Sequence, residues 1–118
     1  GKIVCVFGCG GDRDKTKRAI MGKISGELAD FTVITSDNPR TEVPENIVND
    51  IETGISTVTT NYIKIVDRRE GIKYALNYAN TNDIVVIAGK GHETYQIFKD
   101  NIVEFDERRV VKEIALDK

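Results

Sequence analysis

The alternation of apolar and amphipathic segments is the feature that most constrains the fold of this chain. Short apolar runs recur along the sequence, and stretches with helical periodicity separate them. A strand–helix–strand order of this kind is typical of a mostly parallel sheet covered by helices. We find no internal repeat, low-complexity tract or linker in the 118 residues, so we predict one α/β domain.

The predicted elements follow from hydrophobic periodicity and from capping signals. Ile20, Ile24 and Leu28 share the apolar face of the first predicted helix. The last apolar run of the sheet looks the most deeply buried of the four. The predicted strands are 2–7, 31–35, 62–66 and 83–88, followed by a hairpin of 94–98 and 102–105. The predicted helices are 14 to about 29, one from Pro44, one capped by Asp67 and one capped by Asp106.

Composition and charge exclude several classes of protein. The formal net charge is −2, whereas a nucleic-acid-binding domain normally carries a basic excess. No apolar run approaches the roughly 20 residues of a membrane-spanning helix. Two cysteines, Cys5 and Cys9, do not make a disulfide framework. We therefore expect a cytoplasmic protein that binds neither nucleic acid nor membrane. We also expect it to be a monomer.

Three unusual segments follow predicted strands, at the edge of the sheet where open α/β proteins bind ligands. They are residues 8–18 after the first strand, 37–40 after the second and 89–93 after the fourth. Each is polar or glycine-rich where a simple connection would suffice. Their common position predicts a site assembled from all three.

The first segment, Gly8-Cys9-Gly10-Gly11-Asp12-Arg13-Asp14-Lys15, suggests a phosphate-binding loop, but its details argue against one. Asp14 precedes Lys15-Thr16 where a Walker loop needs glycine, and Arg13 stands where a dinucleotide loop needs its third glycine. The glycines either make a simple tight turn or present Arg13. In the second case we expect the flanking aspartates to orient Arg13 toward a carboxylate.

The second segment, Asp37-Asn38-Pro39-Arg40, is compatible with an ordinary turn that exposes its arginine. In the alternative interpretation, Pro39 fixes the turn so that Arg40 points back over the strand edge. An arginine there can pair a carboxylate through two parallel hydrogen bonds.

The third segment, Gly89-Lys90-Gly91-His92-Glu93, allows a close approach of the backbone to a ligand, or only positive φ angles. His92 is the only histidine, so neither a zinc site nor a Ser-His-Asp arrangement is expected. Glu93 can accept an ammonium group. Together the segments supply two arginines and one glutamate, a set that suits a zwitterion with an extra carboxylate.

Four ordered motifs give the chain a specific resemblance. FGCGGDRDKTKR, SDNPRTEVP, DRREGI and AGKGHETYQ occur in the order and at the spacing of the C-terminal domain of Mur ligases, of the type that adds 2,6-diaminopimelate. The resemblance covers essentially the whole chain. Thr16, Ala19 and Val43 depart from the usual pattern at positions outside the proposed ligand contacts.

The resemblance implies a Rossmann-like domain that binds the incoming amino acid, meso-diaminopimelate. The implied contacts are Arg13, Asp37, Asn38, Arg40, Gly89 and Glu93; no catalytic residue and no metal ligand is implied in this domain. It also implies that ATP and Mg²⁺ serve the full-length enzyme and are bound mainly by other domains. There, the side-chain carboxylate of UDP-N-acetylmuramoyl-L-alanyl-D-glutamate becomes an acyl phosphate, which the diaminopimelate amine attacks.

We expect the chain to be a fragment that lacks the UDP-binding and ATPase domains, and to be inactive alone. Two alternatives stay open. A flavodoxin- or receiver-like binding module could use Asp67 and Lys90, although Arg13 and the hairpin fit it badly. A Mur ligase domain specific for L-lysine is the other, and Arg40 argues against it because lysine lacks the second carboxylate.

Overall fold

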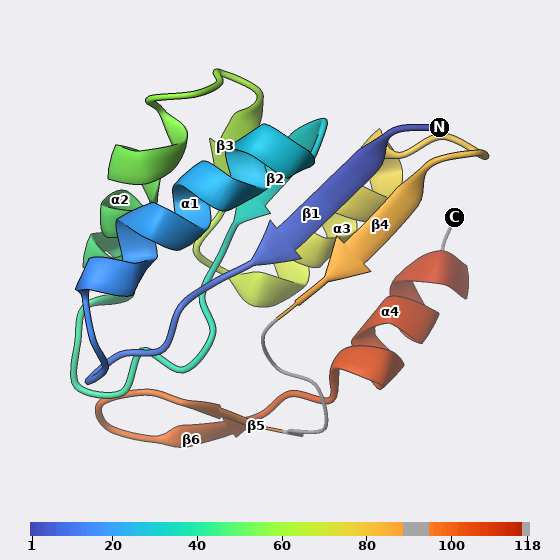
Figure 1. Cartoon of the computed structure of the whole chain (residues 1–118). Helices are drawn as coiled ribbons and strands as arrows, with labels where there is room; N and C mark the ends of the chain where they lie inside the picture. Colours follow the sequence, from blue (N-terminus) through green and yellow to red (C-terminus); the bar gives the residue numbers. More distant parts are fainter. Residues whose placement is uncertain (89–94, 117–118) are drawn as a thin grey trace.

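Four parallel strands form the sheet of the computed structural model, which describes residues 1–88 and 95–116. The order across the sheet is β3-β2-β1-β4, and a separate antiparallel hairpin pairs β5 with β6 (Figure 1). The strands are β1 Ile3–Phe7, β2 Phe31–Ile34, β3 Tyr62–Lys64, β4 Ile84–Ile87, β5 Tyr95–Ile97 and β6 Ile102–Glu104. The predicted α/β class, with its parallel sheet and C-terminal hairpin, is confirmed.

Helices cover the two faces of the sheet and begin where the sequence signals them. Pro44 stands in the first turn of α2, the side chain of Asp67 accepts a hydrogen bond from Glu70 N at the start of α3, and Asp106 accepts one from Arg108 N at the start of α4. The helices are α1 Thr16–Leu28, α2 Pro44–Ile55, α3 Arg68–Tyr78 and α4 Glu107–Leu116. α1 and α2 lie on one face, and α3 and α4 on the other (Figure 1).

Alternate residues of the strands supply two separate core clusters, as the period of a strand requires. Val4 and Val6 of β1 pack with α3 and α4, while Phe7 packs on the opposite face with α2. On α2, the apolar residues Ile47, Val48, Ile51 and Ile55 are all fully or almost fully buried.

The packing of α1 differs from its prediction. Ile20, Ile24 and Leu28 are 57%, 51% and 75% exposed, although they follow one another at i, i+4 spacing along one face of the helix. α1 instead packs on α2 through small residues: a Cβ on Gly54 would lie 1.7 Å from Ala19 O. Close contact between the helix backbones draws α1 toward α2 and leaves its apolar face uncovered.

The burial predicted for the fourth strand is also wrong. β4 lies at the edge of the sheet, where Ile84 is 60% exposed and Val86 is 44% exposed. An apolar run predicts a buried strand, but burial also depends on whether the strand lies at the centre or at the edge of the sheet. The apolar run alone does not show which of the two positions it takes.

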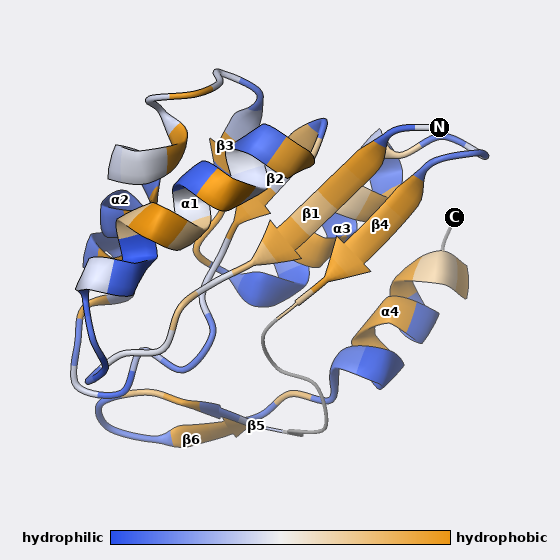
Figure 2. Ribbon diagram, in the orientation of Figure 1, coloured by the Kyte–Doolittle hydropathy of each residue, from blue (hydrophilic) through white to orange (hydrophobic). Residues whose placement is uncertain are grey.

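An apolar groove results between α1 and the edge of the sheet. Figure 2 shows the hydrophobic ribbons of β1 and β4 beside the apolar stripe of α1, with no described helix in front of them. We define the apolar groove by Ile3 and Cys5 of β1, Val86 of β4, and Met21, Ile24 and Leu28 of α1.

None of the helices among the described residues is long and apolar enough to cross a membrane.

Candidate functional site

The first two predicted loops leave neighbouring parallel strands and meet at one edge of the sheet. β1 pairs with β2 up to Phe7 and Ile34, and Thr35 N then donates to Phe7 O at 2.9 Å. Beyond the strands, Gly11 N donates to Asn38 O at 2.7 Å. The structure therefore brings the glycine segment and the Asp37–Arg40 segment into direct contact.

Arg40 occupies the centre of this contact. Its Nη1 donates to Gly11 O at 3.0 Å and to Asn38 O at 3.4 Å, and its backbone N donates to Ile97 O at 2.9 Å. A Cβ on Gly10 would lie 2.9 Å from Nη1, so the glycine makes room for the guanidinium. Within the described chain, Nη2 and Nε have no hydrogen-bond partner and can bind a ligand.

Asn38 is buried beneath the loop, with an exposed fraction of 2%. Its side-chain Oδ1 accepts a hydrogen bond from Ile97 N at 3.0 Å, which fixes the loop to the hairpin. Gln96 on β5 donates to Asp37 O at 2.7 Å and to Ser36 Oγ at 3.2 Å. The sequence alone did not identify Gln96 as part of the site. A polar residue at the centre of a short strand does indicate a buried side chain that needs hydrogen-bond partners.

Arg13 is exposed, and the expectation that its neighbours orient it is wrong. Asp12 Oδ1 accepts from Thr41 Oγ1 at 2.5 Å, and Asp14 Oδ1 accepts from the Thr16 hydroxyl at 2.6 Å. Both flanking carboxylates are thus occupied by threonines. The side chain of Arg13 has no polar contact among the described residues, and the predicted contacts Gly89 and Glu93 lie outside those residues.

The sequence alone also did not identify Arg18, a buried arginine behind the two loops. Arg18 on α1 is 1% exposed and donates to Glu42 through Nη2 at 2.7 Å and Nη1 at 3.0 Å. Nη1 also donates to Asp50 on α2 at 2.9 Å, and Nη2 to Gly10 O at 3.3 Å. Arg18 therefore joins the glycine segment, the second loop and α2.

The Arg18 guanidinium, with a hydrogen bond from Asp12 N, lowers the pKa of Glu42 from its ordinary 4.5 to about 2. Because the pKa is lower in the folded state, the stabilisation is complete above pH 4.5 and disappears as the pH falls toward 2. Because the Glu42 carboxylate is partly exposed and solvent screens the pair, the stabilisation is on the order of 1 kcal/mol. We expect the free energy of unfolding, measured in urea at several pH values, to fall across this range, and to fall by less in Glu42→Gln.

Glu45→Gln is the matched control, since it removes one carboxylate from an exposed position in the first turn of α2. It should retain the acid-induced loss of stability seen in the unchanged chain. If Glu42→Gln and Glu45→Gln gave the same pH profile, the ion pair of Glu42 with Arg18 would not carry the effect.

Charged residues that follow a helix cap are normally solvated, and Arg68, which follows Asp67, is an exception. Asp67 does cap α3, but Arg68 is 1% exposed. Its guanidinium donates to Ser36 O and Ala88 O, both at 3.0 Å, and to Glu107 Oε1 at 2.5 Å. One side chain therefore ties the ends of β2 and β4 to the start of α4.

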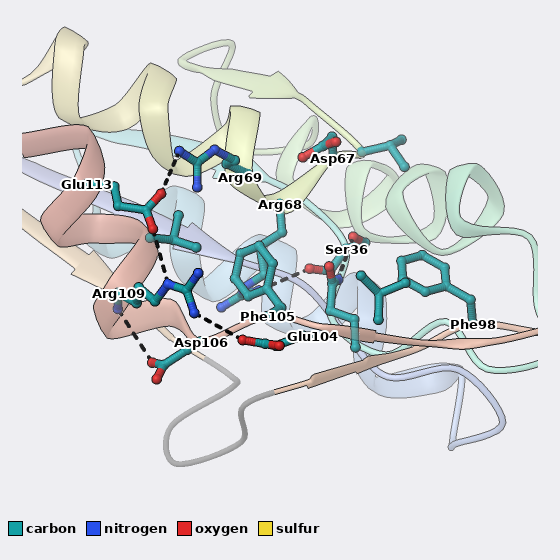
Figure 3. A pocket seen from close by; sticks show the side chains of 14 residues that line it. Ser36, Asp67, Arg68, Arg69, Phe98, Glu104, Phe105, Asp106, Arg109 and Glu113 are labelled. Carbon is teal, nitrogen blue, oxygen red and sulfur yellow. Dashed lines mark hydrogen bonds and ion pairs between the residues drawn. The ribbon is translucent and has the colours of Figure 1, made fainter. Parts of the chain in front are cut away.

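A pocket of about 650 Å³ lies beside Arg68, between α3, α4 and the hairpin (Figure 3). Its charged groups already pair with each other: Arg109 contacts Glu104 at 3.1 Å and Glu113 at 3.2 Å, and Glu113 also binds Arg69. Neither Arg13 nor Arg40 lines it. We therefore place the candidate site at the two loops and not in this pocket.

The remaining chemistry of the described residues favours binding over covalent catalysis. Burial raises the pKa of the Cys9 thiol to about 11 and also raises that of Cys5, so both thiols are protonated at neutral pH. Among the described residues, no three His, Cys, Asp or Glu side chains gather in a way that could hold a metal ion. The two loops instead provide an arginine, Arg40, at the carboxyl ends of the parallel strands.

Fold and loops together define an α/β domain in which the Arg40 loop and the glycine segment meet at the carboxyl ends of two parallel strands. The model of the family described as "Mur ligase, glutamate ligase domain" matches residues 1–91. The chain belongs to this family, as its motifs predict.

Several relatives that share one name resemble the chain over almost its whole length. A UDP-N-acetylmuramoyl-L-alanyl-D-glutamate–2,6-diaminopimelate ligase of Caldanaerobacter subterraneus subsp. tengcongensis is 54% identical over 99% of the chain, which spans 24% of that relative. One of two such ligases from Clostridium acetobutylicum is 56% identical over 97% of the chain. A solved structure of a ligase with this name superposes with a TM-score of 0.91 at 43% identity, over the whole chain and 25% of that structure.

Proposed function

We propose that this chain is the amino-acid-binding domain of a ligase that adds meso-2,6-diaminopimelate to UDP-N-acetylmuramoyl-L-alanyl-D-glutamate in peptidoglycan synthesis. The proposal is supported by the names of relatives more than 50% identical to the chain, which spans about a quarter of their length. In a longer protein of that kind, the apolar groove offers a surface for contact with the other domains.

The guanidinium of Arg40 is the observation that carries the assignment of the amino acid. Diaminopimelate differs from lysine by a carboxylate beside the distal amine. Nη2 and Nε of Arg40, which have no hydrogen-bond partner among residues 1–88 and 95–116, can bind that carboxylate through two hydrogen bonds. Lysine would present only an ammonium group to the same cation. A site of this kind can discriminate by about 10⁴-fold or more.

We assign a different role in amino-acid binding to each of the other proposed contacts. Arg13 is exposed, and its Cγ and Arg40 Nη1 both lie close to Gly10, so Arg13 can meet a second carboxylate. Asp37 can accept an ammonium group. Asn38 holds the loop to β5 through its side chain, and Gly89 and Glu93 complete the expected contacts. The chain's own task is then to bind the amino acid and orient its attacking amine toward the acyl group.

ATP and Mg²⁺ do not fit the described residues. The glycine segment contains neither the glycine-lysine step nor the spacing of a Walker loop, and no cluster of three potential ligands is present among the described residues. We therefore assign both to the rest of the full-length protein, which we expect in the cytoplasm, and we expect this chain alone to be inactive.

The alternatives receive less support. A receiver-like module needs a free carboxylate after the third strand, but Asp67 caps α3 by accepting from Glu70 N at 3.2 Å. Specificity for L-lysine would leave Arg40 facing an ammonium group.

The proposal is tested by ADP release from the full-length protein supplied with ATP, Mg²⁺ and the UDP-muramoyl dipeptide. ADP release should depend on meso-diaminopimelate and should be far slower with L-lysine at the same concentration. This chain alone should release none. Equal rates with the two amino acids, or steady diaminopimelate-dependent ADP release from this chain alone, would contradict the proposal.

A further inference from the structure

Side-chain contacts join the two loops of the site behind Arg40. Thr41 Oγ1 donates to Asp12 Oδ1 at 2.5 Å, and Asp12 N donates to Glu42 Oε2 at 2.6 Å. Arg18 holds both oxygens of Glu42, at 3.0 and 2.7 Å. We call these four residues, Asp12, Arg18, Thr41 and Glu42, the loop latch.

The loop latch holds a backbone conformation that side-chain-bearing residues rarely adopt. Among the described residues, Asp12 and Arg40 are the non-glycine residues with positive φ, at 57° and 54°. Such conformations persist where surrounding contacts hold them in place. Asp12 is held directly by Thr41 and Glu42, which follow Arg40 in the chain.

The same short segment connects the loop latch with the guanidinium of Arg40. Gly10 O accepts a hydrogen bond from Arg18 Nη2 at 3.3 Å, and Gly11 O accepts one from Arg40 Nη1 at 3.0 Å. A shift of residues 10–12 would therefore move the carbonyl that orients Arg40. A bidentate pair depends on alignment, so a small displacement is enough to weaken it.

We propose that the loop latch positions Arg40 and thereby sets the preference of the site for an amino acid with a second carboxylate. This inference rests on the proposed function. Thr41 and Glu42 are positioning residues in this account, because they act on the substrate through Arg40 and do not touch it.

Thr41→Val and Glu42→Gln test the proposal in the full-length protein. Thr41 is exposed, so Thr41→Val removes one hydroxyl contact without opening a cavity. We expect KM for meso-diaminopimelate to rise about 3- to 10-fold in Thr41→Val and about 10-fold or more in Glu42→Gln. KM for ATP and kcat should stay within about twofold, and the preference for diaminopimelate over lysine should fall.

Two further variants separate positioning from a merely structural role. Thr41→Ser keeps the hydroxyl and should restore a low KM, while Glu45→Gln makes the same chemical change as Glu42→Gln at an exposed position and should leave KM unchanged. Glu42→Gln is expected to lower the unfolding temperature in either case, so the kinetics decide between the two roles. A lower kcat with KM unaltered in Thr41→Val and Glu42→Gln would indicate a structural role and overturn the proposal.

The kinetics of the unchanged full-length protein show whether the proposed function or only the role of the loop latch has failed. If its ADP release does not depend on diaminopimelate, the proposed function fails and this inference fails with it. If ADP release depends on diaminopimelate but Thr41→Val and Glu42→Gln retain the original KM and preference, only the role of the loop latch is refuted.

Discussion

Arg40→Lys in the full-length protein is expected to lower kcat/KM for meso-diaminopimelate by about 100-fold or more. Lysine keeps the positive charge but not the planar fork, so a carboxylate loses its paired hydrogen bonds. A hydrogen bond to a charged group typically contributes about 1.5–3 kcal/mol, so the loss of one or both of these bonds accounts for an effect of this size. Steady-state ADP release at varied diaminopimelate concentrations measures the effect.

Arg108→Lys makes the same substitution at an exposed position on α4 and should change kcat/KM by less than twofold. The unfolding temperature of Arg40→Lys should be recorded as well, because Nη1 also holds Gly11 O. Unchanged diaminopimelate kinetics in Arg40→Lys would show that another group binds the second carboxylate.

Arg68→Ala is expected to produce the largest loss of stability in the chain. The substitution leaves Glu107 without its buried partner and leaves the carbonyls of Ser36 and Ala88 without their donor. Removing one member of a buried ion pair typically costs about 3–5 kcal/mol. Urea denaturation of this chain measures the change in the free energy of unfolding.

Arg69→Ala is the matched control, because Arg69 is the next residue and its partner Glu113 is half exposed. Exposed ion pairs contribute about 0–1 kcal/mol, so its effect should be small. Equal losses of unfolding free energy in Arg68→Ala and Arg69→Ala would contradict the conclusion that Arg68 connects β2, β4 and α4.

The element order was predictable because it depends on local signals. Pro44, Asp67 and Asp106 mark helix starts that the structure confirms, and the predicted strands agree with the observed ones to within two residues at their ends. Periodicity and capping are properties of neighbouring residues, so a single sequence contains them.

The failures concern packing between distant segments. The apolar face of α1 was expected against the sheet, but α1 packs on α2 through Gly54, and Leu28 is left 75% exposed. Which of two possible faces a helix buries depends on its neighbours. The edge position of β4 escaped prediction for the same reason.

The site was only half predictable. Parallel topology brings residues 8–15 and 37–40 to one edge, and the structure confirms that they touch. The partners of Arg18 and Arg68 could not be inferred, since Glu42 and Glu107 lie 24 and 39 residues away. An arginine in an amphipathic helix normally suggests a solvated charge, and only tertiary contacts show that it is buried.

An NMR titration of the full-length protein with isotopically labelled arginine side chains would test the central claim most directly. The account predicts that meso-diaminopimelate shifts the Nε–H signals of Arg40 and Arg13 and leaves Arg69 and Arg109 unchanged, while L-lysine at the same concentration has little effect. Equal responses to the two amino acids, or shifts at Arg69 and Arg109 instead, would contradict a carboxylate-binding site at the Arg40 loop.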